Sequence, residues 1–212
     1  MDEPSKKDTT ASEDLRRAVF LDRDGTLNED LGYVHQKEDW HWLPGVVETL
    51  KRLHTAGYLL VVVSNQSGLA REMYTENDLH SLETWVCEDL VSHGTCIDAW
   101  YHCPHLPEIT GPCTCRKPQP GLLLQAANDL HIDLANSWMV GDKVSDVQAG
   151  LAAGCHCLLL RHSEKVDSTD IPEQVAVVPH LAAAGVHILA PQWRSSSLAR
   201  LKRDGTHKDC FG

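Results

Sequence analysis

A chain of 212 residues with 42% hydrophobic and 23% charged residues can bury a core, which excludes a disordered, collagen-like or coiled-coil protein. Its 19 Lys and Arg residues against 30 Asp and Glu residues give a net charge of -11, which disfavours nucleic acid and anionic membranes as partners. The longest strongly apolar run, at residues 58–63, is far shorter than the ~20 residues of a membrane-spanning helix. Because the polar N-terminal segment also lacks the apolar region of a secretion signal, we expect a cytoplasmic protein.

Apolar runs alternate with amphipathic patterns from residue 18 to residue 160. In chain order, these patterns predict a strand at 18–21, a helix from Pro44-Gly45, a strand at 58–63 and a helix from Thr75. They then predict a strand at 99–102, a helix from Pro120-Gly121, a strand at 137–140, a helix around 144–151 and a strand at 157–160. Strands that alternate with helices are typical of a parallel sheet covered on both faces. We therefore expect an α/β, doubly wound, Rossmann-like fold that binds its ligand at the carboxyl ends of the strands.

The two ends of the chain differ from this central region. Residues 1–16 are polar and are expected to form a flexible arm, whereas residues 192–212 form a basic tail that we expect to be disordered. Residues 17–191 should then form a single domain. The short stretch before the helix at Pro44-Gly45 leaves room for a flap at residues 26–37 but not for a large cap domain, so an open site with specificity loops is expected.

Two carboxylates, Asp22 and Asp24, follow the first predicted strand one residue apart. The alternation of side chains along a strand lets both point to the same side, and Gly25 permits a sharp turn directly after them. Such a pair can hold a divalent cation through oxygen ligands. One carboxylate can also attack as a nucleophile while the other transfers a proton.

Three further groups of polar residues lie at predicted strand ends or directly before a predicted helix, and the expected fold would bring them together. Ser64-Asn65-Gln66-Ser67 ends the second strand and supplies hydroxyl and amide donors for a phosphoryl group. Arg116 and Lys117 precede a helix, where two cations favour an anion site. Gly141-Asp142-Lys143 brings another carboxylate to a strand end, and Asp146 follows four residues later.

The order of these groups resembles the haloacid dehalogenase-like phosphohydrolases over residues 18–160, with DRDGT at 22–26, the hydroxyl of Ser64, Lys117, and GDK at 141–143. The resemblance implies a fold of that type with a minimal cap, and an Mg²⁺-dependent phosphatase. Asp22 would attack phosphorus and form an aspartyl-phosphate, while Asp24 would protonate the leaving oxygen and then activate water. Mg²⁺ would bind Asp22, the backbone carbonyl of Asp24, and Asp142, and Ser64 and Lys117 would hold phosphoryl oxygens.

A second, separate cluster of potential ligands lies at residues 103–115. Cys103, His105, Cys113 and Cys115 provide three sulfurs and one imidazole, which is a complete tetrahedral Zn²⁺ set. Four protein ligands leave no open position, so this zinc should be structural and should shape the active site only through the following Arg116 and Lys117. A disulfide or unligated thiols are the alternatives, and a reducing compartment favours zinc.

A zinc loop directly before CRKP narrows the resemblance to the D-glycero-D-manno-heptose-1,7-bisphosphate 7-phosphatases and the related histidinol-phosphate phosphatases. The heptose branch is resembled by LDRDGTLN at 21–28, DLGYVH at 30–35, VVVSNQSGLA at 61–70, YHCPH at 101–105, CRKP at 115–118 and MVGDK at 139–143. This implies removal of the C7 phosphate in the synthesis of nucleotide-activated heptose for a lipopolysaccharide core or related glycan. The residues that would contact the substrate by this resemblance are Asp30, Leu31, Gly32, Tyr33, Ser64, Asn65, Gln66, Ser67, Arg116, Lys117 and Lys143.

Histidinol phosphate stays open as an alternative substrate. The seven residues between His105 and Cys113 are fewer than is usual in the heptose branch and more than in the histidinol branch. A nucleic-acid 3′-phosphatase shares a DxDGT start, but the acidic charge disfavours it. A non-catalytic binding module is disfavoured by the complete set of Asp22, Asp24, Lys117 and Asp142. We therefore expect a monomeric enzyme that acts on a small phosphorylated sugar and has no nucleic-acid partner.

Overall fold

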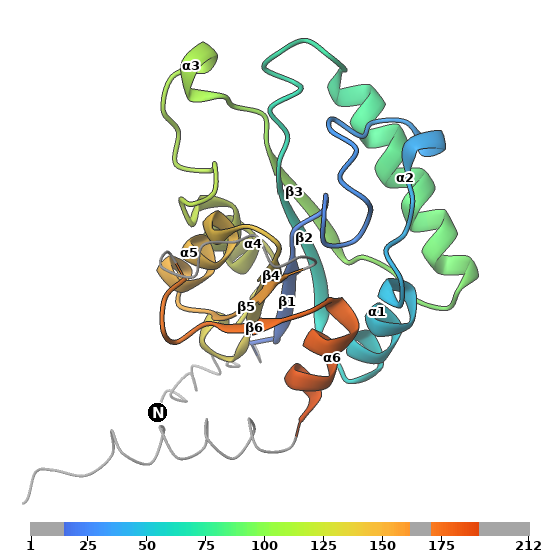
Figure 1. The fold of residues 1–212 in the computed structure, drawn as a ribbon, viewed down its shortest axis with the longest axis vertical. Helices are drawn as coiled ribbons and strands as arrows, with labels where there is room; N and C mark the ends of the chain where they lie inside the picture. Colours follow the sequence, from blue (N-terminus) through green and yellow to red (C-terminus); the bar gives the residue numbers. More distant parts are fainter. Residues whose placement is uncertain (1–14, 162–170, 191–212) are drawn as a thin grey trace, which may run out of the picture.

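The computed structural model describes residues 15–161 and 171–190, and these contain a single parallel sheet in the order β3-β2-β1-β4-β5-β6 (Figure 1). The strands are β1 (Ala18–Leu21), β2 (Leu59–Asn65), β3 (Ala99–Cys103), β4 (Trp138–Gly141), β5 (His156–Leu160) and β6 (Ala176–Val178). The sequence patterns predicted the first five with bounds that shift by one or two residues. The short β6 was not predicted. The α/β, doubly wound expectation is confirmed.

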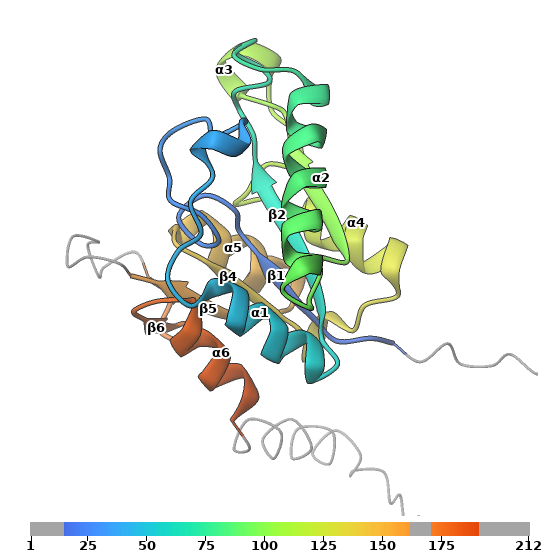
Figure 2. The same ribbon diagram turned by 90° about the vertical axis from the view of Figure 1, so that its right-hand side faces the viewer.

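Six helices accompany the strands within the described ranges, together with 3₁₀ turns at Lys37–Asp39 and Leu134–Asn136. The helices are α1 (Val46–Thr55), α2 (Glu76–Ser92), α3 (Pro107–Thr110), α4 (Gly121–Leu130), α5 (Val144–Ala153) and α6 (Leu181–Leu189). Helices α1, α2 and α6 cover one face of the sheet, and α4 and α5 cover the other (Figures 1 and 2). No helix of the described residues has the length and apolar character needed to cross a membrane.

The side-chain alternation of β1 shows why the sheet must be covered on both faces. Val19 and Leu21 pack into the core beneath α1 and α6, whereas Ala18 and Phe20 pack into the core beneath α4 and α5. All four are completely buried. A strand with apolar residues on both sides is stable only between two layers of helices, which makes β1 a central strand.

The strand order changes direction beside β1, and the space at the carboxyl ends of β1 and β4 is called the crevice below. From β1 the chain proceeds outward to β2 and β3 on one side, and it later returns to build β4, β5 and β6 on the other side. Loops that leave β1 and β4 therefore diverge, and ligands of such sheets bind where they separate. The predicted carboxylate motifs follow these two strands.

The segment between β1 and α1 forms the expected flap and no cap domain. Isolated bridges join Asp24 to Asn28 and Asn28 to Trp42 at its base, and the 3₁₀ turn at Lys37–Asp39 lies against α2. The expected basic tail at 192–212 and residues 1–14 of the expected arm lie outside the described residues. Arg16, near the end of that arm, forms an isolated bridge with Ile132.

Candidate active site

Asp22, directly after β1, lies at the centre of the crevice and is paired with Lys117. The Nζ atom of Lys117 lies 2.6 Å from Asp22 Oδ1, 2.7 Å from Asp146 Oδ1 and 2.7 Å from the Val63 carbonyl oxygen. Burial raises the pKa of Asp22, and the Lys117 ammonium opposes this rise. Burial alone would lower the pKa of Lys117, but the Asp146 and Asp22 carboxylates raise it overall, so Lys117 is a cation.

Asp142 follows β4 and brings a second carboxylate to the same place. Its Oδ1 atom is buried and has no hydrogen-bond partner among the described residues. Burial, followed by the Asp22 charge, raises the pKa of Asp142 to about 7. Gly25 permits this arrangement, because it has a φ of +84° and a Cβ atom at this position would collide with Asp142 Oδ2.

The carboxylates form a donor set that fits a divalent cation. Oxygen atoms of Asp22, Asp142 and Asp146 lie within 4.8 Å of one another. Both oxygens of Asp146 are already engaged, because Oδ1 pairs with Lys117 and Oδ2 accepts the Lys143 N–H at 2.9 Å. Asp22 and the unpartnered Asp142 oxygen are therefore the side-chain groups that suit a hard cation such as Mg²⁺.

Asp146 is the residue of this centre for which the sequence indicated no role. It is almost fully buried and lies at the first turn of α5, where its carboxylate also caps the helix by accepting the Lys143 N–H. Its position in the first turn of the helix that follows Asp142 was the available signal, because an acidic residue there can accept a backbone N–H at the start of the helix.

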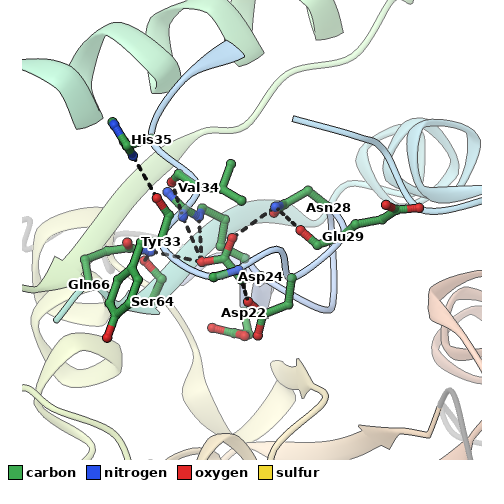
Figure 3. A network of polar contacts seen from close by, with 12 residues as sticks. Asp22, Asp24, Asn28, Glu29, Tyr33, Val34, His35, Ser64 and Gln66 are labelled. Atoms are coloured by element: carbon green, nitrogen blue, oxygen red, sulfur yellow. Dashed lines mark hydrogen bonds and ion pairs between the residues drawn. The ribbon is translucent and has the colours of Figure 1, made fainter. Parts of the chain in front are cut away.

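Asp24 is held by several donors, as Figure 3 shows. Arg23 donates to Asp24 Oδ2 through Nε at 3.1 Å and Nη2 at 2.8 Å, and Asn28 Nδ2 donates to Oδ1 at 3.0 Å. The Arg23 Nη2 atom also donates to the carbonyl oxygen of Val34 in the flap, at 2.6 Å. Arg23 therefore ties Asp24 to the flap. An arginine between two aspartates gave no sequence signal for this role.

The predicted segment Ser64 to Ser67 leaves β2 beside Asp24. Gln66 Nε2 donates to Ser64 Oγ at 3.1 Å, and both side chains are buried. Asn65 instead pairs with the Lys117 backbone, because its Nδ2 donates to the Lys117 carbonyl oxygen at 3.1 Å and its Oδ1 accepts the Lys117 N–H at 3.0 Å. The Asn65 side chain thereby fixes the segment that carries Lys117.

The predicted flap residues Asp30, Leu31, Gly32 and Tyr33 lie at the exposed rim of the crevice. Lys143 Nζ lies 3.2 Å from Asp30 Oδ2, so this part of the flap contacts the loop after β4. Ser67 is half-buried at the end of the loop after β2. The structure thus brings the flap and the loops after β2 and β4 to one edge of the sheet.

The four predicted zinc ligands converge in the loop after β3. Cys115 Sγ lies 3.0 Å from Cys103 Sγ, 3.5 Å from Cys113 Sγ and 3.3 Å from His105 Nδ1. Around a tetrahedral Zn²⁺ with bonds of about 2.3 Å, donor atoms are separated by about 3.8 Å. The Cys115–Cys113 distance is within about 0.3 Å of this value, whereas the Cys115–Cys103 distance is about 0.8 Å shorter. The sulfurs are too far apart for a disulfide bond of about 2.05 Å. The cluster therefore fits zinc.

Arg116 connects the zinc loop to the crevice. Its Nη1 atom donates to the backbone carbonyl oxygen of His105 at 3.0 Å, and the next residue is Lys117. The position of the buried Lys117 therefore depends on the fold of the loop that carries the cysteine cluster.

The chain is similar in sequence to known proteins. A family model described as HAD-hydrolase-like, for the haloacid dehalogenase superfamily, matches residues 114–184. The chain is 50% identical over 141 residues to the D-glycero-beta-D-manno-heptose-1,7-bisphosphate 7-phosphatase of Yersinia pestis, which covers 64% of this chain and 75% of that relative. The enzyme of the same name from Escherichia coli strain K12 is 47% identical over 141 residues, covering 64% of this chain and 74% of the relative.

Solved structures agree with the sequence relatives. The crystal structure of D,D-heptose 1,7-bisphosphate phosphatase from B. bronchiseptica, complexed with magnesium and phosphate, has a TM-score of 0.74 and 34% identity and covers 82% of this chain and 98% of that chain. The corresponding enzyme from Burkholderia thailandensis has a TM-score of 0.63 and 30% identity, with 82% and 99% coverage. The chain therefore belongs to the heptose-1,7-bisphosphate 7-phosphatase family of the haloacid dehalogenase-like hydrolases.

Proposed function

We propose that this protein hydrolyses the C7 phosphate of D-glycero-β-D-manno-heptose 1,7-bisphosphate through an aspartyl-phosphate on Asp22. The observation that carries the proposal is the 50% identity to a phosphatase of this name over three quarters of its length. The convergence of Asp22, Lys117 and Asp142 in one buried centre supports the chemistry. The same identity favours the heptose substrate over histidinol phosphate, the alternative that the zinc-loop spacing left open.

Asp22 is the nucleophile in the first step. One of its carboxylate oxygens attacks phosphorus while the bond between phosphorus and the C7 oxygen breaks, and Asp24 gives a proton to that leaving oxygen. Lys117 and Ser64 hold phosphoryl oxygens as negative charge redistributes. In the second step Asp24 takes a proton from water as the water attacks phosphorus. The Asp22–phosphate bond then breaks and inorganic phosphate leaves.

We assign the catalytic Mg²⁺ to Asp22, the backbone carbonyl of Asp24, and Asp142. The cation supplies positive charge that neutralises the phosphoryl oxygens and orients them for in-line attack. The buried, unpartnered Asp142 oxygen and the raised pKa of this carboxyl group support the assignment. A magnesium- and phosphate-bound relative with 34% identity supports it independently.

The groups assigned to substrate contact surround this centre. Asp30 to Tyr33 in the flap, Ser64 to Ser67 after β2, and Lys143 after β4 lie at the same edge of the sheet, and Arg116 precedes the buried Lys117. We assign Arg116 and Lys143 to the sugar end of the substrate, since their cations suit the anionic groups of a bisphosphate. Zn²⁺ at Cys103, His105, Cys113 and Cys115 has a structural role in this proposal.

The chemistry also indicates a place in metabolism. Removing the C7 phosphate leaves the anomeric phosphate, which is the group that a nucleotidyl transfer requires. We therefore place the reaction in the supply of nucleotide-activated heptose for a lipopolysaccharide core or related glycan. We propose that the enzyme acts as a cytoplasmic monomer on this small-molecule substrate.

Phosphate release from heptose 1,7-bisphosphate and from histidinol phosphate, measured in parallel with Mg²⁺, tests the proposal. We expect a clear preference for the bisphosphate, with the anomeric phosphate retained in the product as seen by ³¹P NMR. Asp22→Asn should abolish turnover without unfolding the protein, and near-normal activity of this variant would remove Asp22 as the nucleophile. A preference for histidinol phosphate would overturn the substrate and leave the phosphatase chemistry in place.

A further inference from the structure

Tyr74 belongs to the segment that joins β2 to α2 and contacts the flap, although no step of the proposed reaction uses it. Its ring stacks on the flap residue His35, with ring centroids 5.0 Å apart and an interplanar angle of 13°. The ring also lies against Gly68, where a Cβ atom would collide with it. Only 5% of the Tyr74 surface is exposed. The ring is therefore fixed by groups from two separate loops.

The hydroxyl of Tyr74 has one short hydrogen bond, which points toward the active site. It donates to Gln66 Oε1 at 2.5 Å. Burial raises the pKa of Tyr74 to about 12, so the hydroxyl keeps its proton and acts as a donor at neutral pH. A donor at this position is satisfied when Gln66 presents its oxygen to Tyr74, as it does here.

With its oxygen engaged, Gln66 must direct its nitrogen toward the catalytic groups. Gln66 Nε2 donates to Ser64 Oγ at 3.1 Å and to Asp24 Oδ2 at 3.4 Å (Figure 3). The reversed amide would place its oxygen against the Asp24 carboxylate, which has no donor to offer it when ionised. A buried group that loses its partner in this way is costly, so the Asp24 carboxylate and the Tyr74 hydroxyl together favour the orientation in which the Gln66 nitrogen faces Asp24.

We propose that Tyr74 is a positioning residue for Asp24, which acts through the amide of Gln66 and connects the general acid to the flap. This inference rests on the proposed function, because it takes Asp24 as the proton donor of that reaction. Arg23 donates to the same Asp24 oxygen and also to the carbonyl oxygen of the flap residue Val34. The Asp24 carboxylate is thus connected to the flap twice, once through Arg23 and once through Gln66 and Tyr74.

The proposal predicts an effect that depends on the leaving group. The oxygen that leaves from sugar C7 is strongly basic and needs the proton of Asp24, whereas the oxygen of an acidic phenol leaves without it. A misplaced general acid therefore slows the release of alkyl alcohols and spares acidic phenols. General loss of structure would slow both kinds of substrate equally, so the leaving group separates positioning from structural support.

The experiment compares Tyr74→Phe with the wild type on phosphate monoesters whose leaving groups range from alkyl alcohols to acidic phenols. We expect kcat/KM to fall about tenfold for heptose 1,7-bisphosphate and alkyl phosphates, and by less than about twofold for the aryl phosphate with the most acidic phenol. The plot of kcat/KM against leaving-group pKa should become steeper. Tyr101→Phe is the matched control, because its hydroxyl contacts Asp129 at the surface and its removal should change no rate.

Gln66→Leu removes the same connection from its other end and carries the test if Tyr74→Phe fails to fold. It should also steepen the leaving-group dependence, and Tyr74→Phe should add less than about twofold in the Gln66→Leu background. Equal losses across the series, unchanged rates, or additive effects of the two substitutions would overturn the positioning role. A wild-type protein that hydrolyses none of the esters would instead overturn the proposed function and, with it, this inference.

Discussion

Lys117 and Asp146 form a buried ion pair, with Nζ and Oδ1 2.7 Å apart and side chains that are only 2% and 1% exposed. The same ammonium group contacts Asp22, the proposed nucleophile. Because Asp146 shares the Lys117 cation, Asp22 does not neutralise it alone. The Asp22 carboxylate is therefore less tightly paired, and a positive charge lies where the proposed reaction needs one for the phosphoryl oxygens.

Replacing Asp146 should impair both the fold and the reaction. Without this carboxylate the Lys117 ammonium pairs with Asp22 alone and is freer to move, so Asp22 becomes a weaker nucleophile. We expect Asp146→Ala to lower the free energy of unfolding by about 3 kcal/mol, as for other broken buried pairs, and kcat/KM by at least about tenfold. Chemical denaturation and phosphate release measure the two effects. Asp129→Ala, on the exposed face of α4, is the control, and an unchanged kcat/KM in Asp146→Ala would exclude the proposed sharing.

Asp142 should couple the stability of the fold to Mg²⁺. Burial and the Asp22 charge raise the pKa of Asp142 to about 7, so above this pH the cation-free protein holds an unfavourable ionised carboxylate. Lowering the pH through about 7 protonates this group, so the cation-free protein should gain stability over this range. Mg²⁺ should remove the same penalty at higher pH, since it binds the ionised form.

Asp142→Asn provides a sharp check of this coupling. At about pH 8 without Mg²⁺, the variant should melt at a higher temperature than the wild type, because the repulsion between Asp22 and residue 142 is gone. Added Mg²⁺ should raise the melting temperature of the wild type but hardly that of the variant, and the variant should have lost Mg²⁺-dependent turnover. Equal stabilisation of both proteins by Mg²⁺ would place the cation elsewhere.

The cysteine cluster should determine both zinc content and stability. We expect one zinc per chain in the wild type, and Cys113→Ser should lose most of it because a serine hydroxyl is a poor zinc ligand beside two thiolates. The melting temperature should fall, and activity should fall with it because the same loop holds Lys117 in place. Metal analysis and thermal unfolding measure these effects. Cys87→Ser, whose sulfur lies outside the cluster, should retain its zinc, and full zinc occupancy in Cys113→Ser would remove Cys113 from the ligand set.

The fold was predictable because its strands carry short apolar runs and its helices have clear starts. The helix from Glu76 is an example, because Thr75 accepts the Asp78 N–H while Asp78 accepts the Thr75 N–H, which is the capping pattern that the sequence displays. The elements after Arg161 were not predicted. Strand β6 has only three residues, and α6 is rich in alanine, so neither has a distinctive period.

The proposed catalytic residues form motifs in the sequence, whereas the residues that hold them in place do not. Asp22, Asp24, Lys117 and Asp142 lie next to elements that the sequence marks, and the parallel sheet brings the ends of its strands together. Arg23, Asp146 and Tyr74 act through contacts between distant segments, such as the bond from Tyr74 to Gln66. Such contacts depend on how the segments pack and on which way a side-chain amide is oriented, and the sequence pattern predicts neither.

The exposed pair of Lys143 and Asp30 should matter for binding and not for folding. Their side chains are 54% and 41% exposed, and ion pairs of this kind add at most about 1 kcal/mol to stability. Carboxylates of Asp142, Asp22 and Asp30 outweigh burial and raise the pKa of Lys143, so it remains a cation at every working pH. A charge at the rim of the crevice suits the sugar end of a bisphosphate.

We therefore expect Lys143→Met to raise KM for heptose 1,7-bisphosphate about tenfold while the melting temperature changes little. An aryl phosphate carries one phosphoryl group and no sugar, so its KM should change by less than about twofold. Steady-state kinetics on both substrates and thermal unfolding decide the outcome, with Lys51→Met on the exposed side of α1 as the matched control. Equal losses on the two substrates would assign Lys143 to the reacting phosphoryl group, because only the centre around Asp22 is common to both.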